Sequence, residues 1–469
     1  MSSLMPVTPP VLLWYRNDLR LADHAALAAA LETGRPVLPV YVRDDAAAAP
    51  WPPGGASRWW LHHSLAALTD ALARTDAPLI LRRGPAAQVL CTLARQVGAE
   101  AVHAGQGLEP GARAQDRAVA ASLAAEGIAF RRFRTMSLLP PDAPRTGAGG
   151  NFSVYTPFAR AAAALVAQLR PPHPAPARIV APPAPASDDL ASWRLLPTRP
   201  DWAGGLRTTW VPGEAGAEAR LRAFLERDLD RYAARRDLPG VSATSRLSPH
   251  LHFGEISPAR VWHAAAPDTG GAEKFRAELL WREFAIHQLW HHPDLPAVPL
   301  RARFAGMPWR ADPTALAAWQ QGNTGIPLVD AGMRELWHTG WMHNRVRMIA
   351  ASFLVKHLLL PWQAGEAWFH DTLVDADLAA NAASWQWVAR SGADAAPYFR
   401  IFNPVLQGRR FDPDGAYVRR WVPELAKLPD AVLHAPWEAG GAVRGYPAPL
   451  IDLAAGRARA LAAFAALPP

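Results

Sequence analysis

Two carboxylates, an amide and two indoles lie within 13 residues of one another near the carboxyl end of the chain: Asp375, Asp377, Asn381, Trp385 and Trp387. Apolar packing alone does not require this mixture of groups. The pattern predicts a helix over Leu378–Ala389, and at about 100° per residue Asn381 and Trp385 share one of its faces. Trp387 points about 200° away from Trp385. One helix is therefore expected to line two compartments; the alternative is a tryptophan-rich core helix capped by an aspartate.

A carboxylate, an indole and a guanidinium share one face of another predicted helix. Glu278, Trp281 and Arg282 fall at positions i, i+3 and i+4, which are neighbours on a helix surface. Such a set could bind a flat heterocycle and its phosphate. The alternative is a surface Glu–Arg pair beside a packing tryptophan.

A third polar segment carries, in order, His343, Asn344, Arg345, Arg347 and Met348. On a helix Asn344 and Met348 share a face, while Arg345 and Arg347 lie on different sides. We expect Arg347 to pair with an acid such as Asp375, and Arg345 to face a phosphate. The histidine has core-like neighbours and is expected to be structural.

The run Thr244–Pro249, with the sequence TSRLSP, follows Tyr232 and Arg236. It offers three hydroxyls and several backbone amides in a turn before a helix, a setting that suits a phosphate or pyrophosphate. A plain helix cap is the alternative reading.

Short apolar runs alternate with helical patterns in the first part of the chain. The runs are Val11–Tyr15, Val37–Val42, Leu79–Leu81, Ala101–His103 and Ile128–Phe133, and the helices are His24–Glu32, Ser57–Arg74, Pro85–Gly98 and Gly111–Glu126. This alternation predicts an α/β domain with a doubly wound parallel sheet, which binds ligands at the carboxyl ends of its strands. The glycines of Gly105–Gly111 are spaced GxGxxxG, one residue off the dinucleotide pattern, so we expect a tight turn, with a nucleotide site as the alternative.

The rest of the chain changes character twice. Thr156 and Pro157 are expected to begin a helix, as a hydroxyl cap and the first helical residue. Seven prolines between Pro171 and Pro185 predict an extended connector. From about Glu214 helical patterns dominate, and 13 of the 20 tryptophans lie there. We expect an α/β domain at 1–134, a proline-rich connector at 135–213 and an all-α domain at 214–469.

The formal charge of +8 and the pI of about 10.1 favour a polyanionic partner. Arginine supplies 46 of the 49 basic residues, and its guanidinium suits bidentate phosphate binding. The single cysteine, Cys91, excludes a disulfide within the chain, a thiolate zinc site and an iron–sulfur cluster held by its own thiolates. We expect a cytoplasmic chain without a signal peptide or a membrane span.

Taken together, these segments resemble those of the DNA photolyase and cryptochrome family, most closely the class I photolyases that repair cyclobutane pyrimidine dimers. The resemblance covers nearly the whole chain, from WYRNDLR at Trp14–Arg20, through TPF at Thr156–Phe158, to RIFNP at Arg400–Pro404. The motifs of the carboxyl-terminal half are long and occur in the family's order.

The resemblance implies that the helical domain holds FAD. The residues that match the binding of its phosphate portion are Tyr232, Thr244, Ser245, Arg246, Leu247 and Ser248. Those that match the isoalloxazine edge are Asp375, Ala376 and Asp377, with Arg347 paired to the first aspartate and Asn381 beside flavin N5. The tryptophans that match the light-driven electron relay to the flavin are Trp385, Trp362 and Trp309.

The resemblance also implies a cavity for a flipped-out dimer. Its matching residues are Glu278, Trp281, Asn344, Met348 and Trp387, with Arg236 and Arg345 as contacts to the DNA backbone and Arg282 grouped with the DNA-binding residues. Glu278 is expected to stabilise the charge that develops on the lesion. The implied activity is light-driven dimer repair by electron transfer from excited reduced FAD, by a monomer acting on DNA that contains pyrimidine dimers.

Two departures leave alternatives open. The stretch Leu108–Ala112 lacks the side chains with which folate-binding relatives hold an antenna chromophore, so a deazaflavin, a second flavin or no antenna remains open. The main alternative function is a cryptochrome-type blue-light photoreceptor. Asn381 and the short tail argue against a plant-type cryptochrome. Met348 argues against the DASH type, and Asn344 together with Met348 argues against repair of (6-4) lesions. A flavin electron-transfer protein without a nucleic-acid role is the third alternative.

Overall fold

The computed structural model describes residues 8–266, 269–395, 399–440 and 442–468. Its amino-terminal part contains a five-stranded parallel sheet in the order β3-β2-β1-β4-β5. The strands are β1 (Val11–Tyr15), β2 (Val37–Arg43), β3 (Ile80–Arg83), β4 (Ala101–Gly105) and β5 (Ala129–Phe133), and the helices between them are α1 (Ala25–Leu31), α2 (Gly55–Ala73), α3 (Ala86–Val97) and α4 (Pro110–Ala125). The predicted doubly wound sheet is therefore confirmed, and every strand lies within two residues of its predicted bounds.

Strand β1 shows why this sheet is covered on both faces. All five of its residues are buried. Leu13 and Tyr15 pack in one apolar cluster with Trp59 of α2, whereas Leu12 and Trp14 pack in another with residues of α3 and α4. Because successive side chains of a strand point to opposite faces, a run that is apolar throughout needs a helical layer on each side.

The segment after the sheet is partly packed rather than only a spacer. It contains α5 (Tyr155–Val166), the 3-10 turn η1 (Leu190–Trp193) and α6 (Gly204–Thr209). The expected helix start, with Thr156 as the cap and Pro157 as the first helical residue, is wrong by two residues: α5 begins at Tyr155, and its cap Val154 makes no side-chain hydrogen bond. Ile179 and Trp193 are buried in the core of the α/β part, so the proline-rich chain wraps that core.

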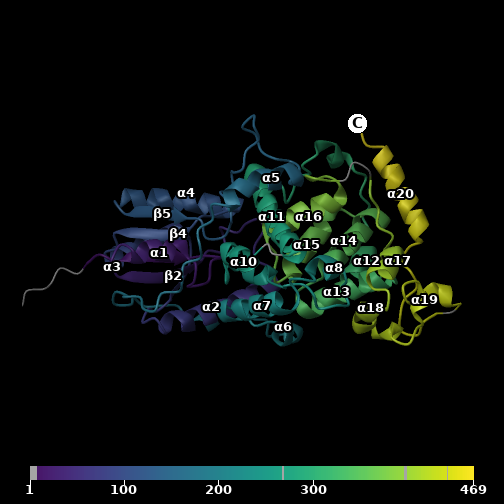
Figure 1. Cartoon of the computed structure of the whole chain (residues 1–469), viewed down its shortest axis with the longest axis horizontal. Coiled ribbons are helices and arrows are strands. Elements are labelled where there is room, and N and C mark those ends of the chain that lie inside the picture. Colours follow the sequence, from purple (N-terminus) through teal and green to yellow (C-terminus); the bar gives the residue numbers. More distant parts are fainter. Residues whose placement is uncertain (1–7, 267–268, 396–398, 441, 469) are drawn as a thin grey trace, which may run out of the picture.

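Every regular element described from Glu214 onward is a helix, as predicted. These helices are α7 (Glu214–Arg227), α8 (Tyr232–Arg235), α9 (Ser248–His252), α10 (Pro258–Ala264), α11 (Gly270–His291), α12 (Pro313–Gln320), α13 (Pro327–Thr339), α14 (Asn344–Ser352), α15 (Trp362–Thr372), α16 (Leu378–Ala389), α17 (Pro404–Phe411), α18 (Ala416–Trp421), α19 (Asp430–Leu433) and α20 (Leu453–Ala465). Shorter turns are η2 (Ala302–Gly306), the π-helical η3 (Phe353–His357), η4 (Pro423–Leu425) and η5 (Pro436–Ala439). Figure 1 shows the sheet with α1–α4 at one end of the molecule and these helices at the other.

Helix α16 occupies the centre of the helical part, in contact with both α11 and α15. Its bounds equal the predicted ones. A methyl group on Gly365 of α15 would lie 2.1 Å from the ring of Trp385, so only glycine allows these two helices to approach so closely.

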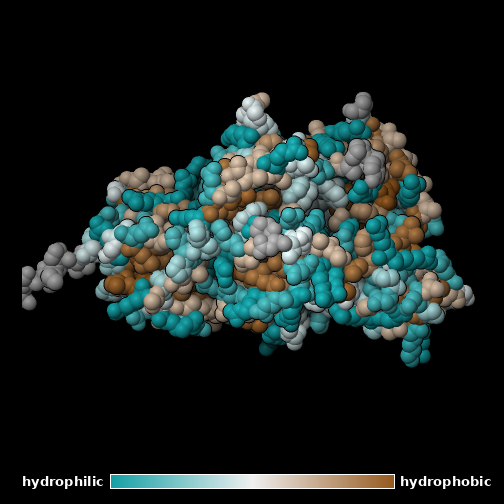
Figure 2. Space-filling model, viewed as in Figure 1, coloured by the Kyte–Doolittle hydropathy of each residue, from teal (hydrophilic) through white to brown (hydrophobic). Residues whose placement is uncertain are grey.

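Hydrophilic side chains cover most of the face seen in Figure 2, and hydrophobic residues appear there in separate patches. Within the described residues, no helix is long and apolar enough to cross a membrane. The proposed boundaries at residues 134 and 213 remain predictions.

Candidate active site

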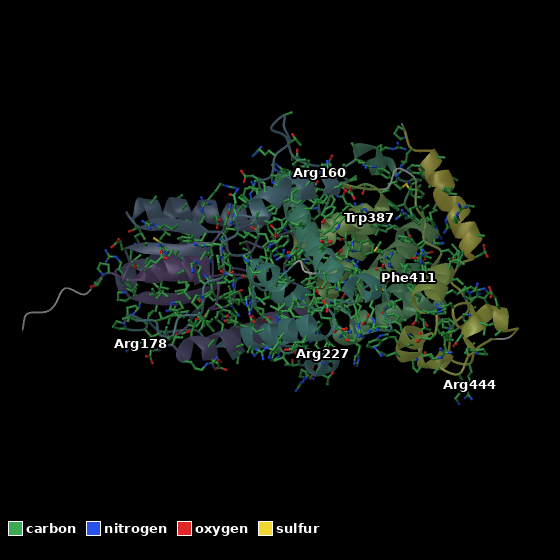
Figure 3. The ribbon with its side chains drawn as sticks, viewed as in Figure 1. Arg160, Arg178, Arg227, Trp387, Phe411 and Arg444 are labelled. Carbon is green, nitrogen blue, oxygen red and sulfur yellow. The ribbon has the colours of Figure 1, made fainter. Side chains whose placement is uncertain are left out.

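A cavity of about 600 Å³ lies between α9, α11, α14 and α16, within the size range of ligand pockets. It brings together residues that are up to 158 positions apart in the sequence. Of the predicted site residues its walls include Arg236, Ser245, Leu247, Ser248, Glu278, Trp281, Arg282, Asn344, Arg345, Arg347, Met348, Asp375, Asp377, Asn381, Trp385 and Trp387. We call it the main cavity. In Figure 3, Trp387 lies among the helices of the carboxyl-terminal part.

The predicted ion pair between Arg347 and Asp375 is present. One guanidinium nitrogen of Arg347 lies 2.9 and 3.1 Å from the two carboxylate oxygens, and Nε donates to the carbonyl of Met342. His343 caps α14 by accepting from the backbone N–H of Arg345, and burial lowers the pKa of its imidazole to about 4. A neutral histidine in a cap fits the predicted structural role.

Asn381 is oriented by a residue that sequence reasoning missed. Its side-chain nitrogen donates to the backbone carbonyl of Glu366 at 3.0 Å and to the carboxyl of Glu366 at 3.1 Å. With the NH₂ group directed at Glu366, the carbonyl oxygen is the polar atom that Asn381 offers to the cavity. Burial raises the pKa of Glu366 to about 7. Asp377 caps α16 by accepting from Ala380.

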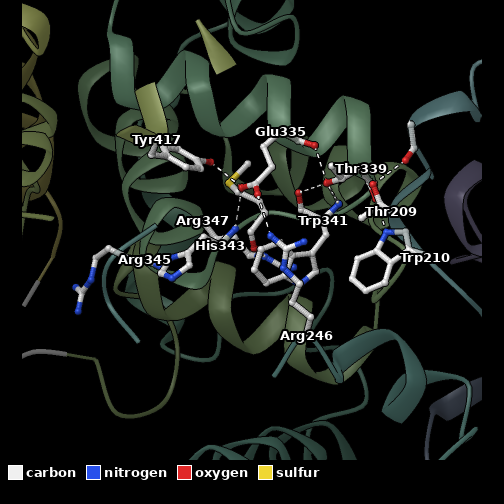
Figure 4. A network of polar contacts seen from close by, with 12 residues as sticks. Thr209, Trp210, Arg246, Glu335, Thr339, Trp341, His343, Arg345, Arg347 and Tyr417 are labelled. Atoms are coloured by element: carbon white, nitrogen blue, oxygen red, sulfur yellow. Dashed lines mark hydrogen bonds and ion pairs between the residues drawn. The ribbon is translucent and has the colours of Figure 1, made fainter. Parts of the chain in front are cut away.

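The TSRLSP turn is held by a buried network (Figure 4). Arg246 has a left-handed backbone with φ of 49°, and its guanidinium lies 4.6 Å from the ring centroid of Trp341. Trp341 donates its indole N–H to the hydroxyl of Ser248 at 3.3 Å. Glu335 lies 4.0 Å from Arg246 and accepts from the hydroxyl of Tyr417 and the backbone N–H of His343. The network thus joins the turn to α13, α14 and α18.

Four predicted flavin residues do not line the main cavity: Tyr232, Thr244, Arg246 and Ala376. Tyr232 packs in a neighbouring apolar cluster beneath the guanidinium of Arg236, 5.4 Å from its ring. Thr244 is half-buried at the start of the TSRLSP turn, and Ala376 lines a second cavity. A direct contact of these four residues with a ligand remains a prediction.

Glu278 lies at the main cavity in an ion pair with Arg236, and Lys274 approaches the same carboxylate at 3.5 Å. Arg345 is paired with Asp237 at 2.8 Å, and Arg236 lies 3.8 Å from Asp237. Both arginines predicted to contact DNA are therefore already neutralised by acids.

Arg282 also lines the main cavity, yet its guanidinium donates to the carbonyl of Met136 at 2.7 Å and pairs with Glu283. It lines the second cavity as well. We therefore assign Arg282 to the boundary between the two cavities and leave it out of the DNA contacts proposed below.

The three relay tryptophans lie in or against one apolar core. Trp385 and Trp362 are both buried in it, and Trp309 packs against its edge. The ring of Trp385 also contacts Phe369 and Trp319, with centroids 5.0 and 6.1 Å away. Trp319 was not among the predicted site residues, because its contact with Trp385 depends on how separate helices pack together. Electron transfer through any of these rings remains a prediction.

The second cavity, of about 400 Å³, lies where the α/β part meets the helices. Residues that follow β1, β2 and β4 form one side of it, as expected for the carboxyl ends of parallel strands. Gly105–Gly111 runs from the end of β4 into α4 without the expected tight turn, and a methyl group on Gly111 would lie 2.2 Å from the carbonyl oxygen of Ala47. Burial and the charge of Asp377 raise the pKa of Glu109 to about 7.

Comparisons with known proteins agree with this geometry. A family profile described as DNA photolyase matches residues 11–178, and one described as the FAD binding domain of DNA photolyase matches residues 275–466. The deoxyribodipyrimidine photo-lyase of Agrobacterium fabrum is 48% identical over 98% of both chains. Cryptochrome-1 of Arabidopsis thaliana is 35% identical over 96% of this chain and 69% of its own length.

A solved structure described as a bacterial class III photolyase from Agrobacterium tumefaciens superposes with a TM-score of 0.94, at 48% identity over 99% of both chains. The expected family resemblance is thereby confirmed. The finer placement beside class I is not supported, because this relative belongs to class III.

Proposed function

The chain belongs to the DNA photolyase family, and from this premise we propose that it repairs cyclobutane pyrimidine dimers in DNA under blue light. One observation carries the proposal: Glu278, Trp281 and Trp387 line the same cavity as Asp375, Asp377 and Asn381. A polar, aromatic pocket thus adjoins the segment expected to bind flavin. The family's FAD-binding domain is present at residues 275–466.

The residues around the main cavity fit FAD. The hydroxyls and amides of the TSRLSP turn would hold its phosphates, and the Asp375 carboxylate, held by Arg347, would lie along the flavin ring. The carbonyl oxygen of Asn381 offers an acceptor to a flavin N–H. When bound and reduced, FAD supplies the light-excited electron that opens the dimer.

The lesion must leave the duplex to enter this cavity, and photolyases are known to act by such flipping. Trp281 and Trp387 offer apolar faces to the extruded bases. Glu278 lines the same cavity, and we propose that its carboxyl group hydrogen-bonds the extruded dimer. Arg236 and Arg345 bind the flanking phosphates, so affinity should depend on salt and little on sequence.

We further propose that the second cavity holds an antenna chromophore. Asp377, His252 and Arg282 line both cavities, which places the two close together. Trp14, Tyr41 and Trp51 contribute aromatic surface, which suits a planar ligand. Chromatography of the chromophores released from purified protein, with their amounts per chain, identifies the occupant; one flavin per chain and no other chromophore would leave the second cavity without an antenna.

The decisive experiment is a repair assay. Purified protein should carry FAD and should remove dimers from irradiated DNA under blue light and not in the dark. Normal flavin content without repair would favour the photoreceptor alternative, which the similarity to Cryptochrome-1 keeps in view. We propose a monomer in the cytoplasm, and size-exclusion chromatography with and without DNA tests the oligomeric state.

A further inference from the structure

Trp281 is backed by an aromatic ring from the connector. The rings of Tyr155 and Trp281 are stacked, with centroids 3.7 Å apart and planes inclined by 6°. The hydroxyl of Tyr155 donates to the carbonyl of Ala277, one turn earlier on α11, at 2.9 Å. Tyr155 therefore covers one face of the indole.

A turn around Asp394 holds the other indole and Tyr155 together. The backbone carbonyl of Asp394 accepts from the indole N–H of Trp387 at 3.2 Å. Its carboxylate accepts from the backbone N–H of Tyr155 at 3.1 Å, and its own N–H donates to the carbonyl of Ser153 at 3.0 Å. Asp394 has a left-handed backbone with φ of 51°, a conformation that aspartate tolerates better than most residues.

We infer that Tyr155 and Asp394 are positioning residues that set the two aromatic walls of the lesion cavity. Trp281 is fixed by stacking and Trp387 by its N–H, and the Tyr155–Asp394 hydrogen bond connects both restraints. This inference rests on the proposed function, because it assigns the indoles to the lesion. Walls that are already in place before binding need no ordering when the dimer enters, which favours tight binding.

The test compares binding of a duplex that carries one dimer with binding of the same duplex undamaged, by fluorescence anisotropy with flavin-loaded protein in the dark. Tyr155→Leu should raise the Kd for damaged DNA about three- to tenfold, because the lost ring contact no longer holds Trp281. The Kd for undamaged DNA and the flavin content should stay unchanged. Tyr155→Phe keeps the ring and should stay within about twofold of wild type.

Asp394 provides an independent variant. Asp394→Ala removes the acceptor of the Tyr155 N–H and should weaken damaged-DNA binding in the same direction, whereas Asp394→Asn retains a carbonyl acceptor and should bind much like wild type. A positioning role is supported if Tyr155→Leu and Asp394→Ala weaken binding of damaged DNA alone. Tyr155→Phe and Asp394→Asn should then bind damaged DNA much like wild type.

Unchanged damaged-DNA affinity in both Tyr155→Leu and Asp394→Ala would overturn the inference. Equal weakening for damaged and undamaged DNA, or a loss of flavin, would also overturn it, since either result indicates a general structural role. Trp281→Ala separates this failure from that of the proposed function. If that variant binds the dimer normally, the assignment of the cavity to the lesion is itself wrong.

Discussion

Glu366 shows how a single buried carboxyl can decide what a neighbouring amide presents to a ligand. It is 3% exposed and receives the amide nitrogen of Asn381 on two of its oxygens. If the nitrogen and oxygen of the Asn381 amide exchanged places, the amide oxygen would face two acceptor oxygens of Glu366. Acceptors do not pair with acceptors, so that orientation is unfavourable. The orientation of Asn381 is thus built into the protein before flavin binds.

Burial also makes Glu366 a source of pH-dependent stability. The carboxyl has a pKa of about 7 in the folded protein against an ordinary value of 4.5. Folding therefore retains a proton, and this contribution to stability is fully present below pH 4.5 and is lost as the pH rises through about 7. Glu366→Gln should remove this dependence, gaining on the order of 2 kcal/mol relative to wild type between pH 5 and pH 8.5.

Urea unfolding of the flavin-loaded protein at the two pH values measures the effect. Glu273→Gln, at an exposed position of α11, serves as the matched control. If the free energy of unfolding changed equally with pH in wild type and in Glu366→Gln, the pH dependence assigned to Glu366 would be contradicted.

Replacing Trp362 alone tests the proposed electron relay. Trp362→Phe should slow light-driven flavin reduction strongly, because phenylalanine is much harder to oxidise than tryptophan. Repair by flavin that has been reduced chemically should be spared. Absorption spectroscopy under illumination measures the first effect and the repair assay the second, with Trp59→Phe in the α/β core as the control. An equal loss of both would contradict the relay role.

At the scale of elements, local signals account for α16 but not for the contacts that complete its function. Asp377 accepts from Ala380 as the cap, and Arg390 ends the helix with a left-handed φ of 70°. The aspartate cap is visible in the sequence, whereas a left-handed arginine is not, because residues other than glycine rarely adopt that conformation. The pairing of Asn381 with Glu366 depends on how α15 and α16 cross, and no helical period encodes that crossing.

The same limit explains why Tyr155 was missed. It lies in the segment that the sequence indicates only as a connector, 126 residues before Trp281. Glu335 was missed for a related reason: its partners Arg246, His343 and Tyr417 come from three separate segments. Periodicity and motif spacing therefore predicted the elements and most cavity residues, whereas the polar residues behind them required the fold.

Glu335 does not line the main cavity, but it joins α13 to the TSRLSP turn, α14 and α18. Its removal should therefore lower both the stability of the fold and the retention of flavin. Glu335→Ala leaves the buried Tyr417 hydroxyl and the His343 N–H without an acceptor, which should cost about 2–4 kcal/mol. The TSRLSP turn should also loosen, and FAD should dissociate faster. Glu335→Gln retains an acceptor oxygen and should lose clearly less.

Denaturant unfolding and the recovery of flavin fluorescence on dilution measure the two effects. Glu424→Ala, which removes an ion pair with Arg334 at 2.9 Å elsewhere on α13, is the control. If Glu335→Ala retained FAD as well as Glu424→Ala does, the link between Glu335 and the phosphate turn would be refuted.

On the scale of the whole molecule, the two arginines that we propose as DNA contacts are both paired with acids. The chain carries a net charge of +8, which attracts any DNA. Yet Arg345 is paired with Asp237 at 2.8 Å and Arg236 with Glu278. A phosphate must displace an acid to reach either guanidinium. We therefore expect these acids to lower the affinity for every duplex, and a damaged duplex to regain affinity through the proposed contacts inside the cavity.

Asp237→Asn tests this arrangement because it frees Arg345 without touching the cavity walls. Its Kd for undamaged duplex should fall about two- to fivefold near 0.1 M salt, and the logarithmic dependence on salt should steepen by up to about one. The preference for damaged over undamaged DNA should shrink, because the aromatic contacts to the lesion are unchanged while background binding rises. Anisotropy titrations over a range of salt concentrations measure all three quantities.

Asp201→Asn, which frees Arg207 in a comparable exposed pair at 2.8 Å, should leave them unchanged. If both variants tightened undamaged binding equally, net charge alone would explain the effect and Asp237 would have no part in damage discrimination.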